Sequence, residues 1–155
     1  MLDLAGQAGS SAGSFAERFA AGWAKGGPPE RFVAHFGPMC APDVLMVQPL
    51  SPPLHGLDGL RQFADSLFGA IPDLRGEVVR SGPTDDGRLI ELTLRGTFGG
   101  RLLEWTVVDR IVLRDGLIAE RHSYFDPTPL LPALWKSPRA ALRLLRGMRQ
   151  RKENR

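Results

Sequence analysis

Two residues of opposite charge, Asp109 and Arg121, lie on successive β-type segments in which the alternate positions on the same face are largely apolar. A charge in such a place is costly to bury unless it is paired or serves a function. An aspartate beside an arginine suits a base or an electrostatic role, because the positive neighbour stabilises the ionised carboxylate. These two residues are therefore the catalytic candidates, provided that their side chains face the same way.

The register of a predicted hairpin decides how the two residues face. A two-residue turn at Asp115-Gly116 would place Arg110 opposite Arg121, where like charges repel. A three-residue loop with the glycine as a bulge residue instead places Asp109 opposite Arg121 and Arg110 opposite Glu120. We therefore expect the three-residue loop, with Asp109 and Arg121 together on the more apolar, inner face.

The inner face of this predicted sheet indicates a pocket for a small organic molecule. Gln48 either points into the same space or bonds to backbone at a strand end, while His122 falls on the outer face and is not expected to act as a pocket base. The ion pair itself is either structural or retained for a ligand or a reaction. The other residues expected to line the pocket are Met46, Ile90, Leu92, Trp105, Val107, Ser123 and Phe125.

Hydrophobic periodicity and chain breakers predict the elements that position these residues. Three helices and one strand precede a four-strand meander, an order that indicates an α+β fold with helices on one face of an antiparallel sheet. The predicted helices cover 14–26, 28–36 and 56–70, and the predicted strands cover 43–49, 74–80, 88–98, 101–114 and 117–125.

Length and composition limit the possibilities further. The 155 residues suit one domain, 14–129, preceded by a disordered tail over 1–13 and followed by a segment over 130–155. The three histidines lie far apart, so neither a metal site nor a cofactor is expected. There is no signal-peptide pattern and no apolar run long enough to span a membrane, which predicts a cytoplasmic protein.

The C-terminal segment and the outer sheet face suggest partners. Residues 127–135 are expected to pack over or near the pocket mouth, and a basic helix is expected to begin after Pro138. This helix either packs or stays solvated, or else contacts an anionic membrane or nucleic acid, which is the less favoured alternative. A homodimer is expected through apolar side chains of the outer face. These are Val108, Val112, Ile118 and Tyr124.

Three segments in sequence order carry a family resemblance: FAERFAAGWAKG, APDVLMVQP followed by GLDGLRQFADSLF, and VVDRIVLRDGLIAERHSYFDP. From about Phe15 to Pro129 the chain resembles the SnoaL-like and ketosteroid-isomerase-like branch of the nuclear transport factor 2-like superfamily. The resemblance implies a cystatin-like cone, in which a curved sheet and three helices in the N-terminal half enclose a hydrophobic pocket. It also implies a polyketide, terpenoid or steroid as the ligand.

The resemblance also implies roles for individual positions. Asp109 falls where ketosteroid isomerases have a protonated aspartate that donates to the dienolate oxygen. Their base and tyrosine positions fall at Gln48 and Phe19, which adds Phe19 to the pocket residues. SnoaL-type polyketide cyclases and limonene-epoxide hydrolases carry an aspartate at the position of Ser123. The epoxide hydrolases also have an arginine and an aspartate near Ile90 and Leu92.

These replacements leave two functions open. One is an isomerase, cyclase or epoxide-hydrolase-like enzyme that moves protons on a hydrophobic carbonyl metabolite without metal or cofactor. The other is a non-catalytic binder or dimeric assembly module that has lost the acids of the family.

Overall fold

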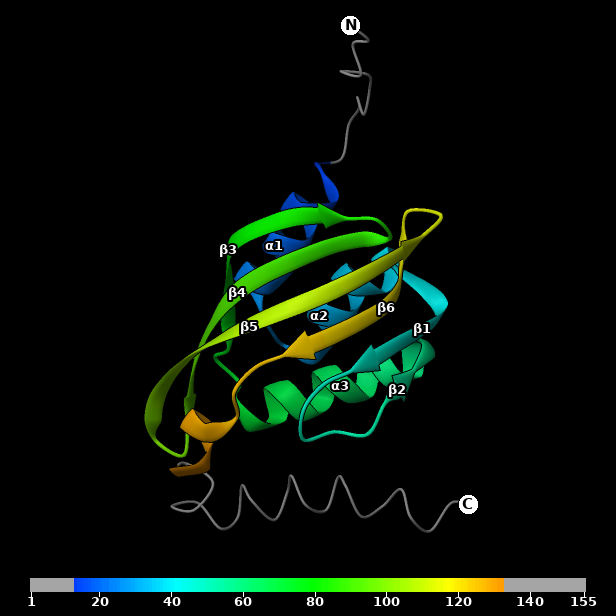
Figure 1. Cartoon of the computed structure of the whole chain (residues 1–155). Coiled ribbons are helices and arrows are strands. Elements are labelled where there is room, and N and C mark those ends of the chain that lie inside the picture. Colours follow the sequence, from blue (N-terminus) through cyan, green and yellow to red (C-terminus); the bar gives the residue numbers. More distant parts are fainter. Residues whose placement is uncertain (1–12, 133–155) are drawn as a thin grey trace, which may run out of the picture.

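A curved six-stranded sheet with three helices on one face forms the framework of the protein (Figure 1). The computed structural model describes residues 13–132. The helices are α1 (Phe15–Lys25), α2 (Pro29–Phe36) and α3 (Gly56–Ala70), with short 3-10 helices at Gly37–Met39 and Thr128–Leu130. The strands are β1 (Cys40–Val47), β2 (Leu54–His55), β3 (Arg75–Thr84), β4 (Gly87–Phe98), β5 (Arg101–Arg114) and β6 (Leu117–Tyr124).

The strand order β2-β1-β6-β5-β4-β3 confirms the predicted α+β fold with one correction. The sheet was expected to be antiparallel throughout, but β1 runs parallel to β6. This pairing joins the first strand to the last, and no turn motif in the sequence predicts it. The predictions for a disordered N-terminal tail and a basic C-terminal helix concern residues outside the described range, 13–132.

Two smaller differences concern strand ends. The third strand was predicted to end at residue 80, yet β3 continues through Gly82-Pro83 to Thr84. A proline is tolerated there because β3 is an edge strand, whose outer row of N–H groups needs no partner strand. The short strand β2, which pairs with β1, lies between the predicted strand 43–49 and the predicted helix 56–70, where no strand was expected.

Helix α1 begins with the capping box that its sequence predicts. The Ser14 hydroxyl accepts from the Glu17 N–H at 3.2 Å, and the Glu17 carboxylate accepts from the Ser14 N–H at 2.8 Å. Four-residue spacing then turns Phe19 and Trp23 towards the sheet, where both are buried. The start of α1 thereby fixes which aromatic side chains enter the core.

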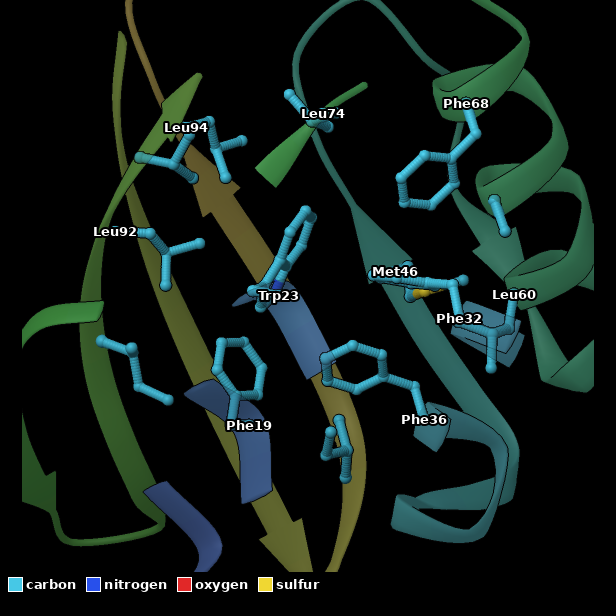
Figure 2. Close-up of a cluster of buried hydrophobic side chains, with 14 of the residues drawn as sticks. Phe19, Trp23, Phe32, Phe36, Met46, Leu60, Phe68, Leu74, Leu92 and Leu94 are labelled. Carbon is cyan, nitrogen blue, oxygen red and sulfur yellow. The ribbon is translucent and has the colours of Figure 1, made fainter. Parts of the chain in front are cut away.

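Aromatic rings from the helices fill the space behind the sheet. Trp23 lies at the centre of this cluster, between Leu92 of β4 on one side and Phe32 of α2 on the other (Figure 2). The Trp23 and Phe32 rings meet edge to face with centroids 5.2 Å apart, a favoured arrangement for aromatic pairs. The buried cluster also includes residues of α3, β1 and β5, so one core joins all three helices to the sheet.

The β5–β6 hairpin differs from its predicted register. The turn has two residues, Asp115 and Gly116, both with positive φ, and Arg114 pairs with Leu117. The pairing then shifts by one residue between Val112 and Leu113, at a bulge. The three-residue loop was therefore the wrong prediction, because a tight turn followed by a bulge was not considered.

The bulge explains why like charges do not face each other. Beyond it, Asp109 pairs with Ser123, Ile111 with Arg121, and Arg110 with His122. Asp109 is therefore not directly opposite Arg121 in the strand pairing, and Arg110 is not directly opposite Glu120, as had been predicted. The true register differs from the predicted one by two residues, so Asp109 and Arg121 still share the inner face.

The outer face is less apolar than the sequence suggested. Ile118, which was assigned to it, turns inward and is buried, because the bulge lies on its C-terminal side. Tyr124 remains 58% exposed on the outer face, with Val108 and Val112 half-buried. The expected homodimer through this face stays a prediction.

We expect Gly116→Ala to destabilise the protein by about 1 kcal/mol, because φ at this residue is 77° and a Cβ atom is strained in that conformation. Nothing lies within 4 Å of a Cβ built there, so the loss isolates backbone strain from steric overlap. Urea unfolding provides the measurement. Asp115→Asn is the control and should be neutral, since asparagine suits the left-handed region. Equal stability of Gly116→Ala and the native chain would contradict the turn.

Candidate functional site

A cavity of about 470 Å³ opens between the inner face of the sheet and helix α3. Its sheet wall carries Leu94, Trp105 and Val107, and its helix wall carries Phe63 and Leu67. The segment 48–52 after β1 contributes a third side. A mainly apolar space of this size is typical of sites for small organic molecules.

A buried ion pair lies at the part of the cavity wall that β6 forms. Asp109 is 0% exposed, and both of its carboxylate oxygens are engaged. The Nε of Arg121 donates to Oδ2 at 2.8 Å, and the Ser123 hydroxyl donates to Oδ1 at 2.6 Å. Asp109 itself does not line the cavity, whereas Arg121 and Ser123 do. The carboxylate therefore reaches the cavity only through its two partners.

Two aromatic rings hold the Arg121 guanidinium in place. Its central carbon lies 5.0 Å from the centroid of the Phe63 ring and 5.6 Å from that of Trp23. Such cation–π contacts stabilise a cation most when it is shielded from water, and only 9% of this side chain is exposed. Within residues 13–132 the guanidinium makes one hydrogen bond, through Nε. Arg121 also lines the cavity, where its guanidinium can donate to a bound molecule.

Strand pairing places a third polar group beside this pair. Met46 of β1 pairs with Arg121 of β6, so continuing the parallel register by two residues brings Gln48 beside Ser123. Gln48 lines the cavity, and its Oε1 is buried without a hydrogen-bond partner among the described residues. A buried acceptor without a partner is unusual, and a bound molecule with a hydrogen-bond donor would satisfy it.

The predicted pocket residues divide into three groups. Those that line the large cavity are Gln48, Trp105, Val107, Arg121, Ser123 and Phe125. Phe19 and Met46 line a second, inner space of about 20 Å³, which holds no more than about one water molecule. Ile90, Leu92 and Asp109 are fully buried and line neither space.

Sequence reasoning missed Trp23 and Phe63, two of the three residues that lie between the two spaces. Trp23, Phe63 and Arg121 line both, so they form a partition between the inner space and the large cavity. Helical spacing correctly indicated that Trp23 and Phe63 face inward. Their contact with a guanidinium had no signal in the sequence, because it depends on how α1 and α3 meet β6.

Other chemistry-bearing groups are not gathered at the site. Within residues 13–132, no three His, Cys, Asp or Glu side chains lie close enough together to hold a metal ion. Burial raises the pKa of the Cys40 thiol to about 11, which keeps it neutral and poorly nucleophilic near pH 7. In the same part of the chain, no helix has the length and hydropathy needed to cross a membrane.

Comparison with known proteins identifies relatives of the chain. The family model described as a SnoaL-like domain matches residues 16–121. No curated protein matches the sequence.

Several solved structures share the fold at low identity. A candidate SnoaL-like polyketide cyclase from Jannaschia sp. CCS1 is 17% identical, with a TM-score of 0.65 over 76% of this chain and 86% of its own. A protein with a ketosteroid-isomerase-like fold from Catenulispora acidiphila, in complex with trimethylamine, is 16% identical, with a TM-score of 0.65 over 76% and 89%. TerC, co-crystallised with polyporic acid, is 20% identical, with a TM-score of 0.66 over 77% and 96%.

We expect Asp109→Asn to destabilise the protein by about 3 kcal/mol, because Arg121 would keep a buried charge without its carboxylate. Urea unfolding followed by tryptophan fluorescence measures the change. Ser123→Ala removes one hydrogen bond to the same carboxylate and should cost less, about 1–2 kcal/mol. The variant that combines Asp109→Asn with Arg121→Met should lose less than the two single variants together. Additive losses would show that the two side chains are not coupled.

Proposed function

The chain belongs to the SnoaL-like domain family, and on this premise we propose that it binds a hydrophobic, carbonyl-containing metabolite such as a polyketide, a terpenoid or a steroid. The observation that carries the proposal is the 470 Å³ cavity, whose walls are mainly apolar and carry Gln48, at the end of β1, and Arg121 and Ser123, on the neighbouring strand β6. Two relatives of similar fold support it: a candidate polyketide cyclase, and TerC, which was co-crystallised with polyporic acid.

In this proposal the ligand lies with its carbon skeleton against Trp105, Val107 and Phe63 and its oxygen at the polar end. Arg121 donates to that oxygen, and Gln48 offers an amide within the same row of side chains. Burial of apolar ligand surface supplies most of the affinity, while the polar groups fix the orientation.

We expect the neutral fluorophore N-phenyl-1-naphthylamine to bind with one saturable site in a fluorescence titration. Val107→Phe adds volume to the cavity wall and should weaken binding about tenfold or more, as overpacking does in other apolar sites. Val108→Phe is the matched control, since it makes the same change on the opposite face of β5, and should leave the affinity unchanged. Circular dichroism checks that both variants fold. Equal affinities in the two variants would place the binding site elsewhere.

A reaction at this site would use Asp109 through Ser123. Asp109 has no exposed surface, so a proton taken from the ligand passes to the Ser123 oxygen as the Ser123 hydroxyl proton moves to Oδ1 over 2.6 Å. The ligand carbon keeps the electron pair of its C–H bond and becomes an enolate, whose oxygen Arg121 stabilises. Return of the proton at another carbon gives isomerisation, and attack of the enolate on a second carbonyl gives cyclisation.

If this relay operates, the protein should accelerate exchange of α-hydrogens of hydrophobic ketones for deuterium in heavy water. Proton magnetic resonance follows the exchange. Asp109→Asn and Ser123→Ala should each slow it by about 10²-fold or more, because a positioned base contributes about 10²–10⁴-fold. His122→Ala on the outer face is the control and should leave the rate unchanged. Exchange that survives both inner-face substitutions would exclude the relay.

A non-catalytic binder is the second candidate. The observation that favours it is the saturated environment of Asp109, whose two oxygens already accept hydrogen bonds from Arg121 and Ser123. Saturable binding of N-phenyl-1-naphthylamine without deuterium exchange on any ketone tested would support this candidate against the enzyme.

A further inference from the structure

The ion pair at the β6 wall of the cavity has a fixed direction. Arg121 lines the cavity, and Asp109 is fully buried without lining it. The pair is therefore a dipole whose positive end faces the ligand and whose negative end is turned into the sheet. A group in the cavity meets the guanidinium first, and the carboxylate lies farther away.

The environment of Arg121 strengthens this asymmetry. Trp23 and Phe63 cover its guanidinium, and their rings are poor substitutes for the oxygen acceptors that its N–H groups prefer. Apart from Nε, the guanidinium has no hydrogen-bond acceptor within residues 13–132. The N–H groups of a permanent cation at a cavity wall favour an acceptor with a full negative charge, because charge-assisted hydrogen bonds are the strongest type.

Other charges near the cavity do not reverse this preference. Asp65 of α3 is the other charged side chain that lines it, and Asp65 is exposed, so water and salt screen its charge. The Ser123 hydroxyl is already committed as a donor to Asp109. Arg121 is therefore the only cationic group that the described part of the chain presents to a ligand here.

From this arrangement we propose that the ligand of the cavity is an organic acid. It carries a carboxylate, or an enolate or phenolate that is ionised when bound, and its oxygen binds the free N–H groups of Arg121. The inference rests on the proposed function, since it names the chemical class of the molecule that the same cavity takes. It narrows hydrophobic carbonyl compounds to those with an acidic oxygen at one end.

Two probes that differ by one acidic group test the inference. 8-Anilinonaphthalene-1-sulfonate is N-phenyl-1-naphthylamine with an added sulfonate, so the ratio of their dissociation constants isolates the contribution of the negative charge. In the native protein the sulfonate should bind at least about tenfold more tightly, in keeping with a charge-assisted contact. Arg121→Met should reduce this preference to about onefold, and Arg121→Lys should keep part of it.

Two controls make the result decisive. Arg61→Met removes the same charge from an exposed residue of α3, outside the cavity, and should leave the preference intact. If Arg121→Met fails to fold, the variant that also carries Asp109→Asn removes both charges of the pair and should show the same loss of preference.

The possible outcomes separate the inference from the proposed function. Binding of the neutral probe with no preference for the sulfonate would overturn the acidic ligand and leave the apolar cavity as the binding site. A preference that persists in the Arg121→Met chain, or falls equally in the Arg61→Met chain, would overturn the role of Arg121. Failure of both probes to bind would overturn the proposed function itself.

Discussion

The fold is arranged around one electrostatic requirement, the burial of the Asp109 carboxylate. A carboxylate removed from water must be compensated by donors, and here Arg121 and Ser123 supply one to each oxygen. Both donors belong to β6, so the pairing of β5 with β6 must hold for the charge to be tolerated. The aromatic rings of Trp23 and Phe63 then fix the arginine from the helix side. Helices and sheet are thus tied together at a charged group as well as through the apolar core.

Most of the fold was predictable because its signals are local. The capping box at Ser14, the four-residue spacing of Phe19 and Trp23, and the period of two along β4 each involve residues close in sequence. The parallel pairing of β1 with β6 was not predictable in this way. It joins segments far apart in the chain, and nothing in either strand marks the direction of its partner.

The hairpin shows how a wrong register can still give the right face. The tight turn at Asp115-Gly116 and the bulge beyond Leu113 together shift the pairs by two residues from those expected, and a shift of two restores the orientation of every side chain beyond the bulge. The ion pair of Asp109 with Arg121 therefore forms diagonally across the strands. Ile118 lies on the turn side of the bulge, where the pairing is shifted by one residue only. Its side chain therefore points inward, and the predicted outward orientation was wrong. The positions of Trp23 and Phe63 in the partition, by contrast, depend on how the helices contact the sheet. The alternation of residues within one strand does not predict such contacts.

The partition of Trp23, Phe63 and Arg121 belongs to the core on one side and to the cavity on the other. A molecule in the cavity would pack against the same rings that hold the helices on the sheet, so occupancy and folding share side chains. By mass action, any ligand that binds only the folded state raises the free energy of unfolding. The melting temperature of this protein should therefore report whether a ligand occupies the cavity. A preparation that melts at two temperatures would contain both ligand-bound and ligand-free molecules.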